Sequence, residues 1–320
     1  MLYAPDHLRI SFKSETYTFS HLVSWAGELH LPRLFLQNLS FKIMVSFSVT
    51  KLLDLPFYTE GPATDVEGNY YFTGLTGGFI GKVDANGIYS KWADGTCPNG
   101  QVVLPNGEHW FCDSRLASIS CYNSAGNFKG HLLSGKCAGV GIGAPNDLIL
   151  DENQNLYFTD SIRTEGKVFF KGTDGTERLV ATNIDYANGL VLSKDERYLF
   201  VAESYQNRIL VMELKEPGIA KGKAEVFAEL PRHSSGNRTD NLPDGLALDH
   251  QGNLWVAHYG MQAVQVLDPG GELLFSIDTT LPLTSNICFV EDNASVRKLL
   301  ITGGYGEPGP GAVLLLNVYN

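Results

Sequence analysis

The chain has 320 residues, of which 43% are hydrophobic and 11% aromatic, so it can bury a substantial core and is not disordered as a whole. Its formal net charge of −11, from 35 acidic and 24 basic residues, argues against a nucleic-acid-binding surface and suits cation binding where carboxylates converge. Five cysteines without a C-x-x-C pair indicate free thiols, and no apolar run reaches the roughly 18 residues of a membrane span, so we expect a cytoplasmic protein that binds no membrane.

Residues 1–43 differ from the rest of the chain. They contain one glycine and none of the phrase that recurs later, and Met44 stands just before the recurring region. We expect residues 1–43 to be an N-terminal extension that is non-native or disordered, and residues 44–320 to form a single domain.

From Thr59 onward one phrase recurs about every 45 residues. It consists of an acid or amide, a short apolar alternation, a turn and a second apolar alternation, as in "TEGPATDVEGNYYFTG" and "PDGLALDHQGNLWVAH". Six copies align on their leading polar residues, which are Glu60, Asn99, Asn146, Asn188, Asp244 and Asn286.

This period with β-type alternation is typical of propeller blades and predicts an all-β, six-bladed β-propeller with four antiparallel strands per blade. In the fifth unit, four short strands are predicted at residues 245–249, 253–258, 263–268 and 272–278. The turns "DVEGN", "DENQN" and "DHQGN" supply the residues that tight connections need. We expect residues 49–55 and 312–318 to pair within one blade and close the ring, because an open ring would leave an unpaired edge.

If each phrase begins the innermost strand of a blade, the six leading residues face one another at the mouth of the central channel. They are two carboxylates and four amides, a set of hard oxygen donors that suits calcium, with magnesium, manganese or zinc as competitors. The alternative is that these residues are ordinary turn formers whose side chains bond the local backbone.

The four phrases "EGPATD", "PNDLILD", "ANGLVLS" and "PDGLALD", in this order, resemble the gluconolactonase and regucalcin group of six-bladed propeller hydrolases. The resemblance covers about residues 50–320 and implies one divalent cation, commonly calcium, held by Glu60, Asn146, Asn188 and Asp244. It also implies a hydrolase that opens a lactone, with Asp244 as both ligand and general base. Phosphotriester hydrolysis is an expected side activity.

Further residues are assigned around this centre. Asp147 is expected to orient the ligands, although it also fits an ordinary turn aspartate, and Asn99 and Asn286 are expected to contact the substrate. The regucalcin branch carries an arginine two residues before the asparagine that aligns with Asn146, whereas this chain has Ala144, so a sugar lactone is not indicated. The segments 137–145 and 215–242 are expected to form the pocket rim.

Two function classes remain open at this stage. The first is a metal-dependent lactone hydrolase, a monomer or weak homo-oligomer, acting on a small molecule. The second is a non-catalytic propeller that binds calcium or a protein partner, since radial scaffolds also serve as platforms. A deep pocket would favour the enzyme, and a broad flat face rich in exposed aromatic residues would favour the platform.

Overall fold

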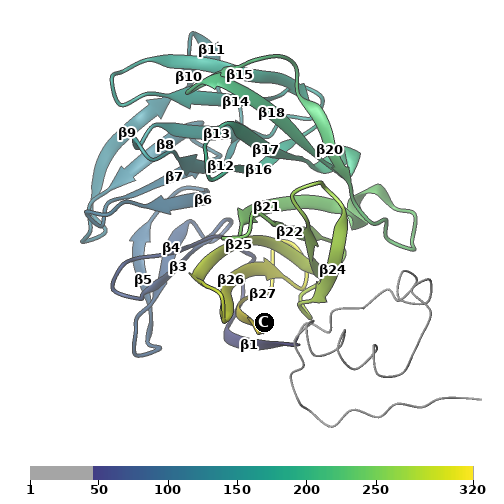
Figure 1. Cartoon of the computed structure of the whole chain (residues 1–320). Coiled ribbons are helices and arrows are strands. Elements are labelled where there is room, and N and C mark those ends of the chain that lie inside the picture. Colours follow the sequence, from purple (N-terminus) through teal and green to yellow (C-terminus); the bar gives the residue numbers. More distant parts are fainter. Residues whose placement is uncertain (1–45, 320) are drawn as a thin grey trace, which may run out of the picture. The chain divides into compact units, whose positions relative to one another are not determined.

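The computed structural model describes residues 46–319, which fold into six antiparallel sheets arranged around a centre (Figure 1). The predicted six-bladed β-propeller is therefore confirmed. The predicted extension at residues 1–43 lies outside the described residues. Within residues 46–319 no helix is long and apolar enough to cross a membrane.

Each of the first three blades begins with its inner strand. Blade 1 contains β2 (Thr59–Thr64), β3 (Tyr70–Gly74), β4 (Phe79–Val83) and β5 (Tyr89–Asp94). Blade 2 contains β6 (Pro98–Val103), β7 (His109–Asp113), β8 (Ser118–Tyr122), β9 (Phe128–Ser134) and the short β10 (Lys136–Cys137) and β11 (Val140–Gly141). Blade 3 contains β12 (Pro145–Leu150), β13 (Leu156–Asp160), β14 (Gly166–Lys171) and β15 (Glu177–Ile184).

The other three blades follow the same plan. Blade 4 contains β16 (Ala187–Leu192), β17 (Tyr198–Glu203), β18 (Arg208–Glu216), β19 (Ile219–Ala220) and β20 (Glu225–Glu229). Blade 5 contains β21 (Leu242–Leu248), β22 (Leu254–Tyr259), β23 (Ala263–Leu267) and β24 (Leu273–Asp278). Blade 6 contains β25 (Leu283–Asp292), β26 (Val296–Gly304), β27 (Gly311–Tyr319) and, from the other end of the domain, β1 (Ser46–Leu55).

The ring closes as predicted. Strand β1 pairs antiparallel with β27 from Ser46 opposite Tyr319 to Leu55 opposite Gly311. The Thr59 hydroxyl, at the start of the next inner strand, donates to the carbonyls of Gly303 and Ala312 at 3.0 and 2.7 Å. The closing blade is thereby tied to blade 1 by buried hydrogen bonds.

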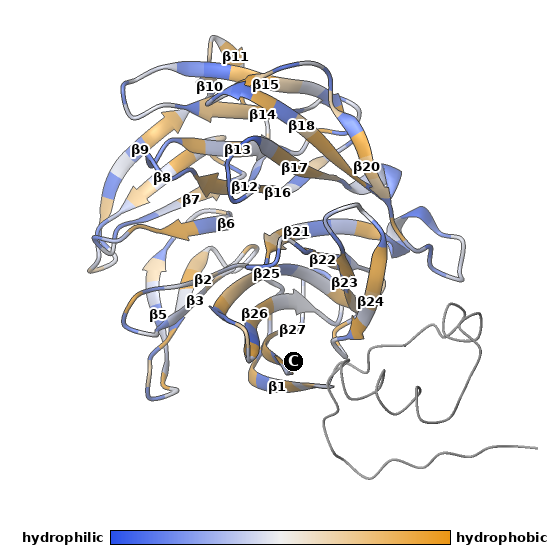
Figure 2. Cartoon of the chain, in the orientation of Figure 1, coloured by the Kyte–Doolittle hydropathy of each residue, from blue (hydrophilic) through white to orange (hydrophobic). Residues whose placement is uncertain are grey.

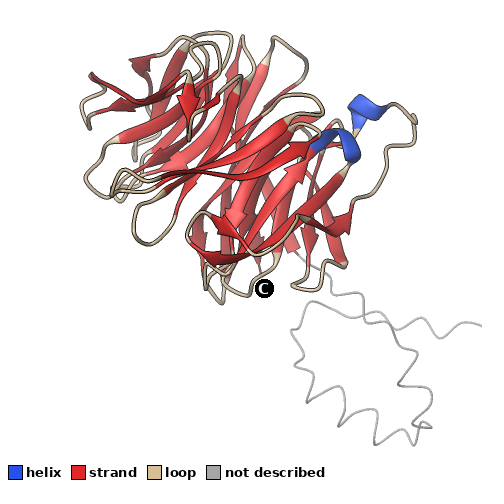
Figure 3. Ribbon diagram, turned by 90° about the horizontal axis from the view of Figure 1, so that it is seen from above, coloured by secondary structure: helices blue, strands red, loops and turns tan. Residues whose placement is uncertain are grey.

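The core lies between neighbouring blades. Buried hydrophobic side chains of the described residues form six clusters, each bridging two adjacent sheets. In one of them Trp255 of blade 5 packs with Ile287 and Leu316 of blade 6. Figure 2 shows hydrophobic residues concentrated on the strands. Within residues 46–319 the helical segments are the short turns η1 (Ser204–Gln206) and η2 (Arg238–Asp240), and Figure 3 shows that strands dominate the fold.

Tight turns join each inner strand to the second strand, at the end of the inner strand opposite to the leading residues. In three of them an aspartate, Asp65, Asp151 or Asp249, accepts hydrogen bonds from the backbone N–H groups two and four residues later, at 2.8 to 3.0 Å. A side-chain amide four residues on also donates to each of these carboxylates. These Asp-x-x-x-Asn turns are therefore internally satisfied, as their spacing predicts.

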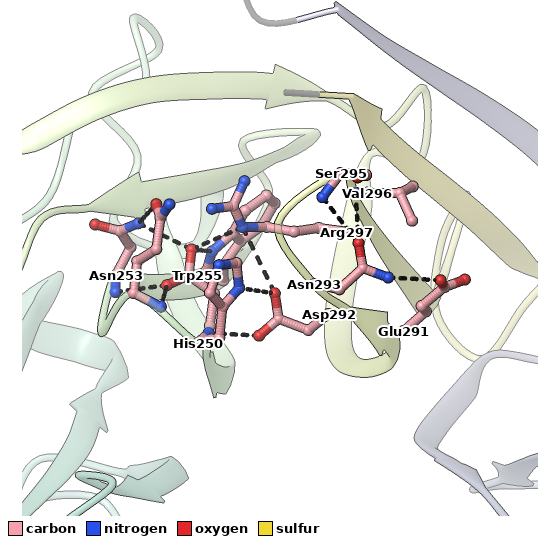
Figure 4. Close-up of polar contacts among 11 residues, drawn as sticks. His250, Asn253, Trp255, Glu291, Asp292, Asn293, Ser295, Val296 and Arg297 are labelled. Carbon is pink, nitrogen blue, oxygen red and sulfur yellow. Dashed lines mark hydrogen bonds and ion pairs between the residues drawn. The ribbon is translucent and has the colours of Figure 1, made fainter.

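The turn of blade 5 also joins blade 6. Asp249 Oδ2 accepts from Trp255 Nε1 at 3.1 Å and lies 3.0 Å from Arg297 Nε. His250 Nδ1 lies 2.6 Å from Asp292 of blade 6. Figure 4 shows His250, Trp255, Asp292 and Arg297 gathered at this junction. A buried carboxylate thus braces two neighbouring blades.

Candidate active site

The leading residues stand where each inner strand departs from regular pairing. The register between inner and second strand shifts near the start of every blade: between Glu60 and Ala63, Pro98 and Gln101, Pro145 and Leu148, Ala187 and Leu190, Pro243 and Leu246, and Thr284 and Asn286. A bulge of this kind releases residues from the ladder and redirects their side chains. Bulges repeated in all six blades turn polar side chains toward one channel mouth.

A pocket of about 310 Å³ lies at this mouth. Its lining includes all four predicted metal ligands, Glu60, Asn146, Asn188 and Asp244, together with Asn99. The remaining lining residues are Tyr58, Leu75, Tyr186, Ser204, Tyr205, Thr239, Leu242, Tyr259 and Glu307. The predicted rim is thus partly realised, because segment 215–242 contributes Thr239 and Leu242 while segment 137–145 contributes no lining residue.

The amide oxygens of this pocket are prepared for a ligand. Asn188 is 5% exposed, and its Nδ2 donates to Ser204 Oγ at 3.2 Å. Ser204 Oγ in turn donates to the carbonyl of Pro243 at 2.7 Å, which fixes the orientation of the amide. Among the described residues, the Oδ1 atoms of Asn188 and Asn99 have no hydrogen-bond partner. Leaving a buried acceptor without a partner is costly, so both oxygens fit a role in binding a cation or a substrate.

The carboxylates of the pocket lack positive neighbours. Burial raises the pKa of Glu60 above its usual range, the Asp147 charge adds to this rise, and a hydrogen bond from the backbone N–H of Gly61 opposes it. Burial and then the charges of Glu60 and Asp147 raise the pKa of Asp244 in the same direction. No lysine, arginine or histidine of the described chain lines the pocket. Two buried carboxylates without a cationic partner fit a divalent cation.

The four predicted metal ligands are of two chemical types, carboxylates and amides. No group of three or more His, Cys, Asp or Glu side chains in residues 46–319 is arranged to hold a metal ion. The predicted set instead combines two carboxylates with two amides, which is the hard-oxygen chemistry of calcium rather than that of zinc. These side chains therefore fit a calcium-like ion by their oxygen donors, their burial and their unbalanced charge.

Asp147 and Asn286 lie across the channel from each other and outside the pocket lining. The inner strands contact one another in the circular order β2, β6, β12, β16, β21, β25, so β12 and β25 are opposite. Asn286 Nδ2 donates to Asp147 Oδ2 at 3.4 Å, and both residues are less than 9% exposed. Burial raises the pKa of Asp147 to about 6. This arrangement suits Asp147 for orienting its neighbour Asn146, whereas substrate contact by Asn286 stays a prediction that the pocket lining does not support.

The alignment that placed Asn286 level with Asp244 is wrong by one residue. A Cβ atom on Gly189 would lie 2.7 Å from the Cα of Gly245, and one on Gly245 would lie 2.7 Å from the Cα of Asn286. Asn286 is therefore equivalent to Gly245, and Ser285 occupies the level of Asp244. The buried Ser285 hydroxyl donates to the carbonyl of Thr59 at 3.1 Å, beside Glu60. Sequence reasoning missed Ser285 because it preferred the amide to the hydroxyl.

Four tyrosines and Glu307 also escaped the sequence analysis. Tyr58 and Tyr186 stand two residues before Glu60 and Asn188, so period-two alternation would have placed them on the same side of the chain. Leu242 holds the corresponding place before Asp244. Tyr205, Tyr259 and Glu307 come from the ends of other strands and loops, and no periodic signal marks them.

Comparison with known proteins agrees with this architecture. Residues 58–304 match the model of the SMP-30/Gluconolactonase/LRE-like region. A lactonase drp35 of Staphylococcus haemolyticus is 34% identical over 131 residues, which are 39% of each chain. A gluconolactonase of Zymomonas mobilis is 28% identical over 211 residues, covering 60% of this chain and 58% of that protein. The matches thus span roughly 39% to 58% of these curated relatives.

A solved structure gives a longer match. The gluconolactonase of Xanthomonas campestris superimposes with a TM-score of 0.71 at 26% identity, covering 84% of this chain and 89% of that chain. The similarity therefore extends around nearly the whole propeller and includes the blades that form the pocket.

Proposed function

Because this chain belongs to the SMP-30/gluconolactonase/LRE-like family, we propose that it is a metal-dependent hydrolase that opens lactone rings. The observation that carries the proposal is the convergence of two buried carboxylates and two amides, one with an unpartnered oxygen, in a single pocket. The presence of a recessed pocket favours the hydrolase over a non-catalytic platform.

Glu60, Asn146, Asn188 and Asp244 would hold the divalent cation, with calcium as the preferred ion and magnesium, manganese or zinc as alternatives. When bound, such a cation would polarise the lactone carbonyl and stabilise the negative charge that develops on its oxygen. The Ser204 hydroxyl keeps the Asn188 amide oriented for this role, and Asn286 donates a hydrogen bond across the channel to Asp147, the neighbour of Asn146.

The reaction needs one proton acceptor and one donor. A water oxygen forms a bond to the lactone carbonyl carbon while an Asp244 carboxylate oxygen accepts the proton of that water. The bond between the carbonyl carbon and the ring oxygen then breaks, and the proton passes from Asp244 to the departing alkoxide. The product is a hydroxy acid. Asn99, with its free amide oxygen in the same pocket, is suited to orient the substrate.

The test is a lactone panel offered to metal-stripped protein, with calcium, magnesium, manganese or zinc added back and a phosphotriester included. We expect turnover to return with calcium, and the free energy of unfolding to rise by about 2.7 kcal/mol when calcium is at one hundred times its Kd. Asn188→Ala should lose both responses, whereas the exposed turn variant Asn86→Ala should keep them. Stabilisation without turnover would leave the cation site standing and refute the reaction; the absence of both would refute the site as well.

A further inference from the structure

The pocket carries an excess of negative charge. Its lining contains three carboxylates, Glu60, Asp244 and Glu307, and no basic side chain of residues 46–319 lines it. Arg163 contacts this lining, because its guanidinium lies 3.6 Å from the centre of the Tyr205 ring. That charge is already matched, because Arg163 Nε lies 2.7 Å from Asp185 Oδ1. A bound divalent ion would balance Glu60 and Asp244 but would leave Glu307 uncompensated.

Glu307 is placed to meet a substituent of the substrate. It lies on the loop between β26 and β27, is exposed, and accepts a hydrogen bond from Tyr259 Oη at 2.9 Å. Burial and then the Glu307 charge raise the pKa of Tyr259. Glu307 thus contacts the aromatic lining of the pocket directly without being one of the predicted ligands.

The aromatic lining of the pocket also favours a positively charged substituent. The rings of Tyr58 and Tyr259 pack edge to face with their centroids 6.4 Å apart, and those of Tyr186 and Tyr205 do so with centroids 5.5 Å apart. The face of a tyrosine ring attracts cations through its quadrupole. The pair of Tyr58 and Tyr259, whose Tyr259 hydroxyl contacts the unbalanced Glu307 carboxylate, is therefore suited to an ammonium group and disfavours a carboxylate or phosphate.

We propose that the pocket selects lactones that carry a protonated amine over uncharged ones and disfavours anionic ones, with Glu307 as the specificity-determining residue. This inference rests on the proposed lactone hydrolysis and names its substrate class. Glu307 acts on the substituent and not on the reacting carbonyl, so it affects KM and leaves kcat unchanged.

The experiment uses three γ-lactones that carry a positive, a neutral or a negative side chain at the same position: an aminoethyl group, its N-acetyl derivative, and a carboxyethyl group. Values of kcat/KM are divided by the rate of spontaneous opening for each compound. For the calcium-loaded protein we expect the amine to exceed the N-acetyl compound by about fivefold and the carboxylate to fall below it by a similar factor. Added salt should reduce the differences in kcat/KM among the three compounds.

Two variants assign the effect. Glu307→Gln should bring the three compounds within about twofold through KM, whereas Glu67→Gln, the same change of charge in the turn between β2 and β3, should preserve the order. The corresponding lactams, which resist opening, are titrated by calorimetry as a readout that does not need turnover. An order that is absent or reversed in the native protein, or one that survives Glu307→Gln, would overturn the inference. If no lactone is opened but the lactams bind in the expected order, the inference holds for the ligand class while the proposed hydrolysis fails.

Discussion

The two ends of the inner strands carry similar acidic side chains, but these differ in the hydrogen bonds that their carboxylates accept. At the turn end, Asp65, Asp151 and Asp249 accept hydrogen bonds from their own turns. At the pocket end, Glu60 and Asp244 are buried near each other and near Asp147, with few donors. Burial opposes ionisation of Asp65, but hydrogen bonds from Asn69 and its neighbours hold its pKa below the usual range. At the pocket end burial and like charge prevail, and the pKa of both carboxyls rises.

This difference distinguishes the acids that stabilise turns from the acids that we propose to be functional. Both kinds stand at equivalent positions of more than one blade and both precede or follow an apolar alternation, so residue type and spacing do not distinguish them. The two kinds of acid differ in the number of N–H groups that donate hydrogen bonds to each carboxylate. A carboxylate whose oxygens already accept such bonds has no capacity left for a cation. Four measurements would break or sharpen this comparison.

Asp244→Asn should have the largest effect. We expect kcat/KM for lactone opening to fall about a thousandfold, since a general base contributes on this scale. The metal-free protein should unfold at the same or a higher urea concentration than the native protein, because the variant removes a buried charge that repels Glu60. A variant that is both inactive and strongly destabilised would place Asp244 with the structural acids.

Asp249→Ala should show the reverse pattern. It leaves Arg297 without its 3.0 Å carboxylate partner and removes the acceptor of Trp255 Nε1, so we expect a loss of about 3 kcal/mol in the free energy of unfolding. Urea titration measures this loss. Activity per folded molecule should not change, and a selective loss of activity would contradict the division between the two ends.

Two buried histidines, one near each end of the inner strands, show how burial acts on groups that carry a positive charge. Burial lowers the pKa of His109, at the turn end, and of His258, near the pocket end, to about 3. Each is neutral and hydrogen bonded, His109 Nδ1 to Gln101 Oε1 at 3.2 Å and His258 Nε2 to Asn207 Oδ1 at 2.9 Å.

Because the unfolded chain binds these protons near pH 6.5 and the folded protein only near pH 3, each histidine lowers the stability as the pH drops through this window. The raised pKa values of Glu60 and Asp244 act in the opposite direction, because folding favours their protonated forms. Between pH 7 and pH 4.5 we expect each histidine to contribute a loss of about 2.5 kcal/mol. Urea curves at both pH values measure the net dependence; His109→Gln should remove the share of His109, while the exposed control His131→Gln should leave the dependence unaltered.

Asn286→Leu should have the smallest effect, about 1 kcal/mol, because it removes one 3.4 Å hydrogen bond to Asp147. KM should stay within twofold of the native value. A tenfold rise in KM with unchanged stability would instead restore the prediction that Asn286 contacts the substrate.

The sequence predicted the propeller well because each blade repeats the same local pattern. Period-two alternation, Asp-x-x-x-Asn turns and the pairing of residues 49–55 with 312–318 are all encoded locally or by the need for ring closure. The same repetition brought the four predicted ligands to one pocket, because equivalent positions in a radial repeat face the same channel.

Repetition also explains what the sequence could not provide. In blade 6 the pattern weakens, and a serine stands where the other blades have an acid or amide, so the alignment moved to Asn286. Tyr259 and Glu307 enter the pocket from a strand end and a loop whose positions depend on tertiary packing. The orientation of the Asn188 amide depends on Ser204 and Pro243, which are distant in sequence and adjacent only in the fold.

Ring closure also determines when the pocket is completed during synthesis of the chain. Glu60 follows Thr59, whose hydroxyl is held by carbonyls of Gly303 and Ala312 in the closing blade. During synthesis the residues of the first blade emerge long before those of the last, and pairings of such high sequence separation form slowly. The proposed cation site would therefore be completed only when β27 has joined β1. A nascent chain would then lack the proposed activity until the ring closes.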